Sequence, residues 1–208
     1  MNIEILCHSS IKIMDLEKTI YLDPFRIKEN RNDADIIAIT HSHYDHFSEE
    51  DIVKVKNENT KILVTTDLFE RTLELGFSKE NIVCVMPNNE YKVLGIEINT
   101  IHAYNEKKKF HPKTNNWVGY ILNLENQKVY IAGDTDITEE NRNVKCDIAL
   151  VPIGGTYTMD YIEAAELVNN IKPKKVIPMH YAEIVGSKED GIRFKEKVDN
   201  NIEVEIQI

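Results

Sequence analysis

Apolar residues recur along the chain in short runs that predict β-strands. The runs are rich in β-branched side chains, which a pleated strand accommodates well. They are IEIL, IKIM, TIYLD, ADIIAIT, KILVTT, IVCVM, EYKVL, IEINTI, WVGYILNL, KVYIAGD, CDIALVPIGG and KVIPMH. ADIIAIT (34–40) is almost continuously apolar, as expected of a strand buried on both faces. The tail IEVEIQI alternates apolar and polar residues, which predicts a half-exposed edge strand.

Four helices are predicted between and after these strands, from apolar spacing and from capping residues. They cover about residues 48–56, 67–76 and 161–171 and a segment that opens at Ser187. Ser48 stands three residues before Asp51, in the spacing of a capping box. The order of elements is β-rich, mixed, β-rich and mixed, which suggests two sheets with helices outside. No linker or internal repeat divides residues 1–208, so we expect a single α/β domain.

The charge balance narrows the classes of partner. The chain has 25 basic and 35 acidic side chains and a formal net charge of −10. An acidic surface argues against non-specific nucleic-acid binding, which needs a basic footprint. No apolar run approaches the roughly 18 residues of a spanning helix, so no membrane association is expected.

The cysteines and the N-terminus bear on the compartment. Cys7, Cys84 and Cys146 are odd in number and far apart, so we expect reduced thiols in a cytoplasmic protein. Cys84 and Cys146 lie in or beside apolar runs and are predicted to be core residues. The opening MNIEILCHSS lacks the charged and apolar regions of a secretory signal.

Metal-competent side chains cluster in the stretch ITHSHYDHF (39–47). Three of the seven histidines and a carboxylate lie there, at His41, His43, Asp45 and His46. The cluster follows directly after a predicted buried strand, at the end where α/β sheets place ligands. His41 and His43 alternate by two, so both can face the same side of an extended segment. Imidazole and carboxylate together suit zinc, manganese or iron.

Three further metal-competent residues end other apolar runs. His102 ends INTIH, Asp134 follows KVYIA, and His180 ends KVIPMH. A lone histidine is more often a structural residue, but this recurrence at strand ends favours a metal site over coincidence. Structural zinc sites are closed, four-coordinate and rich in cysteine. Five histidines and two aspartates are too many ligands for one such ion, so the set suggests two ions.

These residues resemble the signature of a known superfamily. THSHYDH is similar to the His-x-His-x-Asp-His motif of the metallo-β-lactamase superfamily, and His102, Asp134 in GDT and His180 match its later ligands in order. HSS (8–10), LDPF (22–25) and PIGGTYTM (152–159) resemble the branch that contains L-ascorbate-6-phosphate lactonase and N-acylphosphatidylethanolamine phospholipase D. Phe47-Ser48 stands where relatives often have Gly-Asp.

The resemblance implies a fold and a ligand set. The fold is the four-layer αβ/βα sandwich of the metallo-β-lactamases. One divalent ion is expected on His41, His43 and His102. A second ion is expected on Asp45, His46 and His180, with Asp134 bridging the two. Zinc is the first expectation for both ions, with manganese or iron as alternatives.

The same resemblance implies metal-dependent hydrolysis by a metal-bound hydroxide. Asp45 is expected to orient the nucleophile as well as to bind metal. We expect a small anionic ester, lactone or phosphoester as substrate, because the branch contains a lactonase for a phosphorylated sugar acid and an enzyme that cleaves a phosphodiester. A lysine-rich loop at 105–117 could steer an anion toward the metals, although a solvated surface loop is the slightly favoured interpretation of its lysines. His8, His111 and Tyr157 are candidate substrate-binding residues. Asp136 and Thr135 are candidates for fixing the ligand imidazoles, although Asp136 could equally be a turn residue.

Other functions remain open at this point. A mononuclear iron dioxygenase of the same superfamily would keep these histidines, and a non-catalytic metal-binding protein would keep the whole ligand set. A nuclease is disfavoured by the net charge of −10. The expected partner is a small-molecule substrate, without nucleic acid or membrane, and the sequence leaves a homo-oligomer open.

Overall fold

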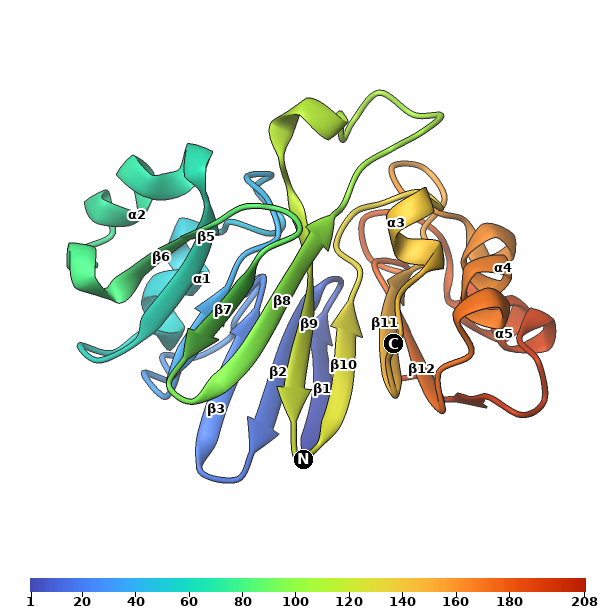
Figure 1. Cartoon of the computed structure of the whole chain (residues 1–208), viewed down its shortest axis with the longest axis horizontal. Helices are drawn as coiled ribbons and strands as arrows, with labels where there is room; N and C mark the ends of the chain where they lie inside the picture. Colours follow the sequence, from blue (N-terminus) through green and yellow to red (C-terminus); the bar gives the residue numbers. More distant parts are fainter. The chain divides into compact units, whose positions relative to one another are not determined.

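The computed structural model describes residues 1–208, and its strands form two mixed sheets (Figure 1). Contacts within the chain define two units, unit 1 at Met1–Met86 and unit 2 at Pro87–Ile208. Each unit contains one sheet and its own helices. None of the helices combines the length and the apolar composition needed to cross a membrane.

Unit 1 contains a six-stranded sheet in the order β1-β2-β3-β4-β5-β6. The strands are β1 (Asn2–Cys7), β2 (Ser10–Asp15), β3 (Lys18–Leu22), β4 (Ile36–Ala38), β5 (Lys61–Thr65) and β6 (Ile82–Val85). Strands β1 to β3 pair antiparallel, and β3 to β6 pair parallel. The helices are α1 (Glu49–Val55) and α2 (Phe69–Glu74), with 3-10 turns η1 (Thr66–Leu68) and η2 (Lys79–Asn81).

The core of unit 1 forms where the parallel strands meet the helices. Ile37, Ile62 and Val64 of the strands pack in one buried cluster with Ile52 and Val55 of α1. Figure 1 shows α1 and α2 beside β5 and β6. Because β3 to β6 run parallel, their carboxyl ends lie at one edge of the sheet, where the segment after β4 begins.

Unit 2 contains a seven-stranded sheet in the order β13-β12-β11-β10-β9-β8-β7. The strands are β7 (Glu90–Val93), β8 (Ile96–His102), β9 (Val118–Leu124), β10 (Gln127–Ile131), β11 (Ile148–Pro152), β12 (Lys175–Met179) and β13 (Glu203–Val204). Strands β7 to β10 pair antiparallel, and β10 to β13 pair parallel. The helices are η3 (Lys113–Asn115), α3 (Glu139–Arg142), α4 (Tyr161–Ile171) and α5 (Lys188–Lys197).

The core of unit 2 lies between its parallel strands and its two longer helices. Val151 and Val176 of the strands pack with Val168 of α4 and Phe194 of α5 in one buried cluster. Figure 1 shows α4 and α5 beside β11 and β12. Asp160 caps α4 by accepting hydrogen bonds from the backbone N–H groups of residues 162 and 163.

Several predicted elements differ in detail from the structure. The run at 34–40 forms a strand only over Ile36–Ala38, and the tail pairs only over Glu203–Val204. The predicted core position of Cys84 is wrong, because Cys84 is exposed on β6, an edge strand of the sheet. Cys146 is half-buried rather than buried.

Helix α1 begins where predicted but is not capped as predicted. Ser48 does not cap the helix with its side chain and instead donates a hydrogen bond to the Asp51 carboxylate at 2.7 Å. Asp51 also accepts from the backbone N–H groups of Arg26 and Ile27 at 2.7 and 2.9 Å. Its carboxylate therefore joins α1 to the loop after β3, a long-range contact that the local spacing does not reveal.

Candidate metal centre

The histidines of unit 1 are gathered by a tight turn after β4. The backbone N–H groups of His46 and Phe47 both donate to the carbonyl of His43, at 3.0 and 2.8 Å. The turn leaves Nε2 of His41 3.0 Å from Nδ1 of His43. The rings of His41 and His46 are 3.9 Å apart between centroids. His41 and His46 are buried, and His43 is partly exposed.

Asp23 and Thr40 support two of these imidazoles from behind. Asp23 accepts from the backbone N–H and the hydroxyl of Thr40 at 2.8 and 2.7 Å, and its Oδ2 lies 2.7 Å from Nδ1 of His46. Since the Thr40 hydroxyl gives its only proton to Asp23, it can only accept from Nδ1 of His41, 2.9 Å away. Both histidines therefore carry a proton on Nδ1, which leaves Nε2 free of hydrogen to bind a metal.

Asp23 is fully buried among these donors. Burial raises the pKa of its carboxyl above the usual value, whereas the contacts with His46 and Thr40 lower it. Its backbone φ is +44°, in the left-handed region that residues other than glycine rarely adopt. His8 and His180 have φ values of +54° and +58°. Strained backbone of this kind gathers at functional sites, where the surrounding structure enforces it.

His8 and Asp45 lie next to each other within unit 1. His8 is completely buried, and its Nε2 is 3.5 Å from Oδ2 of Asp45. The same carboxylate oxygen is 3.7 Å from Nε2 of His46. One carboxylate oxygen of Asp45 therefore faces two imidazoles. Through this contact His8 lies beside the cluster that the motif at 41–46 forms.

In unit 2, Asp134 lies against two histidines. Its Oδ2 is 3.2 Å from Nε2 of His111 and 3.1 Å from Nε2 of His180, and all three side chains are buried. Asp134 follows β10 and His180 follows β12, so two strands of the parallel part of the sheet position two of these three side chains. Gly154 after β11 makes room for His180, because a Cβ there would lie 2.3 Å from the His180 carbonyl oxygen.

His102 is placed differently from the other predicted ligands of unit 2. It is the last residue of β8 and is half-buried, with its ring edge-on to Tyr104 at 6.0 Å. Burial lowers the pKa of its imidazole, and the charge of Lys113 lowers it further. His102 makes no hydrogen bond or ion pair with Asp134, whereas His111 lies within contact distance of that carboxylate.

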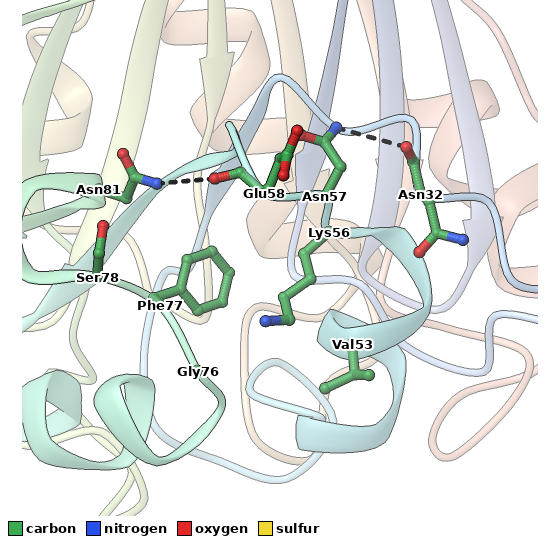
Figure 2. Close-up of a pocket in the computed structure, with 9 residues that line it drawn as sticks. All are labelled: Asn32, Val53, Lys56, Asn57, Glu58, Gly76, Phe77, Ser78 and Asn81. Atoms are coloured by element: carbon green, nitrogen blue, oxygen red, sulfur yellow. Dashed lines mark hydrogen bonds between the residues drawn. The ribbon is translucent and has the colours of Figure 1, made fainter.

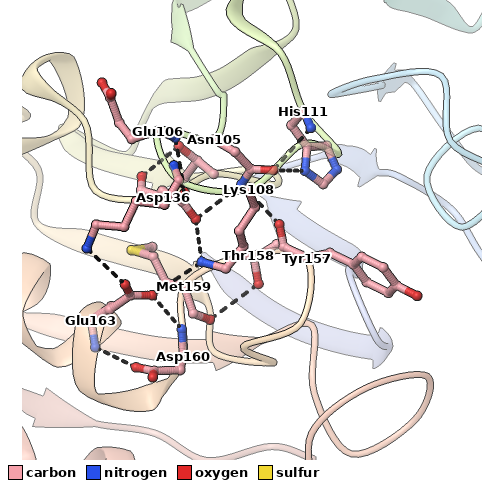
Figure 3. A network of polar contacts seen from close by, with 12 residues as sticks. Asn105, Glu106, Lys108, His111, Asp136, Tyr157, Thr158, Met159, Asp160 and Glu163 are labelled. Atoms are coloured by element: carbon pink, nitrogen blue, oxygen red, sulfur yellow. Dashed lines mark hydrogen bonds and ion pairs between the residues drawn. The ribbon is translucent and has the colours of Figure 1, made fainter.

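The loop between β8 and β9 carries His111 and the predicted basic residues. Nδ1 of His111 lies 2.9 Å from Oδ1 of Asn105, as Figure 3 shows. Asp136 and Thr135 contact no imidazole. Asp136 instead accepts from Asn105 Nδ2 at 3.1 Å, and the Thr135 hydroxyl bonds the backbone of Tyr104. Both residues therefore shape the loop, and Asn105 is the residue that contacts the histidine.

Most of the lysines in this loop are neutralised within unit 2. Lys107 and Lys108 both lie within ion-pair distance of Glu163, at 3.7 and 3.5 Å, and Lys108 also binds Asp136 at 2.8 Å. Lys113 binds Glu140 at 2.6 Å, which leaves only Lys109 of this group without an ion pair. These contacts favour a structural role for the lysines over steering of an anion.

Tyr157 lies at the rim of the same loop. Its ring is edge-on to that of Phe110 at 4.7 Å, and its backbone carbonyl accepts from Asn105 Nδ2 at 3.0 Å. Phe110 is 47% exposed, so the pair presents an aromatic surface next to His111. Figure 3 shows the Tyr157 side chain directed away from the polar network.

The side chains of each unit fit a divalent metal. Two ligands that bind a tetrahedral ion at about 2.0–2.1 Å lie about 3.3 Å from each other. The His41–His43 separation of 3.0 Å matches this spacing. The contacts of Asp134 with His111 and His180, at 3.2 and 3.1 Å, match it as well. Imidazole and carboxylate donors suit zinc, manganese or iron.

A groove elsewhere in unit 1 contains none of these residues (Figure 2). It has a volume of about 490 Å³ and is lined by Asn32, Val53, Lys56, Asn57, Glu58, Gly76, Phe77, Ser78 and Asn81. Lys56 Nζ lies 4.9 Å from the centre of the Phe77 ring. The Asn57 and Asn81 amides donate to backbone carbonyls across the groove, so they stabilise its walls.

Three supporting residues were not predicted from the sequence, namely Asp23, Thr40 and Asn105. Asp23 had a visible signal, because it ends the apolar run TIYLD as the ligands end theirs. Thr40 precedes the motif and resembles an ordinary strand residue. Asn105 lies in a polar loop among other polar residues, so only the closed loop in the structure reveals its contact with His111.

Comparison with known proteins places the chain in a family. The model of the beta-lactamase superfamily domain matches residues 2–180 and so spans parts of both units. A UPF0173 metal-dependent hydrolase from Thermococcus onnurineus is 31% identical over 98% of this chain and 95% of its own. The chain therefore belongs to the beta-lactamase superfamily, and within it to the UPF0173 metal-dependent hydrolases.

Solved structures support the fold. A protein from Parabacteroides distasonis superposes with a TM-score of 0.82 at 28% identity, covering 98% of this chain and 91% of that one. Igni18, a metallo hydrolase from Ignicoccus hospitalis, gives a TM-score of 0.79 at 24% identity, covering 98% and 93%. The metallo-β-lactamase fold expected from the sequence is thereby confirmed.

Proposed function

We propose that this protein hydrolyses a small ester, lactone or phosphoester with the help of two divalent metal ions. The family of metal-dependent hydrolases supports the reaction class. The lactone and phosphoester alternatives rest on the resemblance of LDPF and PIGGTYTM to the lactonase and phospholipase D branch. The proposed ligands are His41, His43, Asp45 and His46 of unit 1 and His111, Asp134 and His180 of unit 2.

This proposed ligand set contains His111, whereas the resemblance in sequence implied His102 as the ligand. The single observation that carries the choice is the position of Asp134, whose Oδ2 lies 3.2 Å from His111 Nε2 and 3.1 Å from His180 Nε2. His102 is only half-buried and packs against Tyr104 instead. His111 is thus proposed as a ligand rather than as a substrate-binding residue.

The bound ions would supply a water of lowered pKa and a Lewis acid for the attacked group. The protein's own side chains set up that chemistry. Asp23 and Thr40 hold His46 and His41 so that Nε2 of each is available to bind. Asp45, with one oxygen near both His8 and His46, is placed to accept a hydrogen bond from the attacking water and to orient it.

The proposal does not require an anionic substrate. Three of the four lysines in the loop at 105–113 are paired with Glu163, Asp136 or Glu140, so little free positive charge remains there. The Phe110–Tyr157 pair, in which Phe110 is exposed and Tyr157 is half-buried, offers an aromatic surface beside His111 instead. We therefore propose a substrate with an apolar or neutral group on this side of the reacting bond.

The experiment is a hydrolysis screen with metal-stripped and reconstituted protein. Zinc or manganese should restore activity toward at least one carboxylic ester, lactone or phosphodiester, and Asp45→Asn should abolish that activity. Iron-dependent consumption of oxygen without hydrolysis would indicate the dioxygenase instead. Two bound ions with no turnover across the panel would indicate a non-catalytic metal-binding protein. Either of the last two results would refute the proposed function.

A further inference from the structure

The loop that carries His111 is closed by a single asparagine. The backbone N–H of Asn105 donates to the His111 carbonyl at 2.8 Å, and the His111 backbone N–H donates to Asn105 Oδ1 at 3.1 Å. The same oxygen lies 2.9 Å from His111 Nδ1. Asn105 is 8% exposed and His111 is 1% exposed, so these hydrogen bonds are shielded from water.

The partners of Asn105 determine which way its amide faces. The His111 backbone N–H can only donate, so the atom facing it must be the amide oxygen. On the other side, the amide nitrogen faces two acceptors, Asp136 Oδ1 at 3.1 Å and the Tyr157 carbonyl at 3.0 Å. A flipped amide would place donor against donor and acceptor against acceptor, so only one orientation satisfies all four contacts.

This orientation sets the tautomer of His111. Because the amide oxygen can only accept, Nδ1 of His111 must carry the proton. Nε2 then presents its lone pair on the side where Asp134 Oδ2 lies 3.2 Å away. The imidazole is therefore held in the form that a metal ligand requires.

Asp136 anchors the asparagine in turn, as Figure 3 shows. Its Oδ1 accepts from Asn105 Nδ2 and from Lys108 Nζ, at 3.1 and 2.8 Å. Its Oδ2 accepts from the backbone N–H groups of Glu106 and Lys107, at 3.0 and 3.1 Å. Asp136 is 3% exposed and its carboxylate has four donors, so it has little freedom to move.

We propose that Asn105 is a positioning residue that fixes the Nδ1-protonated tautomer of His111, and that Asp136 holds Asn105 in the orientation this requires. The inference rests on the proposed function, in which His111 is a metal ligand. It assigns to a neutral amide the task that a carboxylate performs for His46 in unit 1. It also explains why the lysine-rich loop is ion-paired, since Lys108 completes the anchor on Asp136.

The first test compares metal affinities by chelator competition. Asn105→Ala should weaken zinc binding by about 10–100-fold, as removal of a residue that supports a metal-binding histidine does. Asn105→Asp keeps an acceptor for His111 Nδ1 but places its second oxygen against Asp136 Oδ1 and the Tyr157 carbonyl, so it should recover only part of the affinity that Asn105→Ala loses. Asn123→Ala is the matched control, because Asn123 lies on β9 and its amide bonds only the exposed Glu97 side chain. It should bind zinc as the wild type does.

The second test reads the tautomer without metal or substrate. Nitrogen-15 histidine spectra of the metal-free protein should show His111, assigned by its loss in His111→Ala, with the proton on Nδ1. In Asn105→Ala the same ring should shift to the Nε2-protonated form or to a mixture, whereas in Asn123→Ala it should keep the proton on Nδ1. If Asn105 were purely structural, Asn105→Ala would leave the His111 tautomer unchanged, whatever its effect on the melting temperature.

The outcomes separate this inference from the proposed function. If His111→Ala keeps the full metal content, the proposed ligand set fails, and the positioning role fails with it. If His111→Ala loses metal but Asn105→Ala keeps wild-type affinity and the Nδ1-protonated ring, only the positioning role is overturned. Should Asn105→Ala not fold, Asp136→Asn answers the same question, because its amide nitrogen must face donors on either side, and wild-type affinity with an unchanged tautomer would contradict the inference.

Discussion

The two units present their histidines in contrasting ways. In unit 1 one turn after β4 supplies His41, His43 and His46, and a buried carboxylate, Asp23, supports the last of them. In unit 2 the histidines come from separate segments of the chain. His111 lies on the long loop between β8 and β9, where the neutral side-chain amide of Asn105 supports it. A contiguous motif fixes its ligands by local geometry, whereas a dispersed set depends on loops whose course the sequence does not specify.

The largest expected effect on metal binding is at Asp134, whose carboxylate contacts both buried histidines of unit 2. Asp134→Ala removes the carboxylate that lies against both His111 and His180. We expect metal affinity to fall by more than the roughly 10–100-fold that loss of a supporting residue costs, because Asp134 is itself a proposed ligand. Equilibrium dialysis followed by elemental analysis measures this. A variant that retains its metals would show that Asp134 is not a ligand.

The next comparison concerns two phenylalanines beside the candidate ligands. Phe47 follows His46 and is 1% exposed in the core of unit 1, whereas Phe110 precedes His111 and is 47% exposed. Phe47→Ala should therefore destabilise the protein by about 3–5 kcal/mol, and Phe110→Ala by less than about 0.5 kcal/mol. Urea unfolding of the metal-free variants measures both. Equal losses would contradict the difference in burial.

A smaller effect is expected at Asp23, the counterpart of Asn105. In Asp23→Asn an amide nitrogen must face either the Thr40 backbone N–H or His46 Nδ1, both of which donate. The substitution should weaken zinc binding by about 10–100-fold, toward the upper end because a charged acceptor is lost. Chelator competition on Asp23→Asn and Asn105→Ala ranks the two supports. A smaller loss for Asp23→Asn would reverse the ranking.

The smallest effect concerns acid stability at the end of the His111 loop. Burial acts to raise the pKa of Glu140, but hydrogen bonds from Lys113 and Tyr104 outweigh it and lower the pKa from 4.5 to about 2. A carboxyl with a depressed pKa stabilises the fold above pH 4.5 and loses that contribution as the pH falls toward 2. Because Lys113 is about half exposed, the contribution should not exceed about 1 kcal/mol.

Melting curves between pH 6 and pH 2 test this expectation. Glu140→Gln should be less stable than the wild type near neutral pH, and the difference should vanish at the acid end of the range. Glu166→Gln is the control, since its ion pair with Arg142 is more exposed and should add little at any pH. A difference that stays constant with pH would show that the ion pair is not the cause.

Sequence patterns predicted the strands and the clustering of the unit 1 histidines well, because both depend on neighbouring residues. The apolar runs correspond to the strands β1 to β12, and the motif at 41–46 lies in the expected turn after β4. The pattern missed α3, because four residues are too few to show a helical period. It also could not detect the contact of Asp51 with the loop at Arg26, which joins residues far apart in sequence.

The spacing of residues along the chain could not distinguish His111 from His102 as a candidate metal ligand. His102 is the last residue of β8, which favours it as a ligand on sequence grounds, whereas His111 lies in the loop that follows. The structure folds the next residues into a loop closed by Asn105, and that loop brings His111 to Asp134. Loop closure depends on the asparagine amide and on Asp136, thirty-one residues further along the chain.

The most direct test of the account is the metal content of three proteins purified without added metal. Wild type, His111→Ala and His102→Ala should be analysed for zinc, manganese and iron per chain. We predict about two ions in the wild type, a loss of at least one in His111→Ala, and wild-type content in His102→Ala. Loss of metal from His102→Ala, with full content in His111→Ala, would contradict the proposed centre.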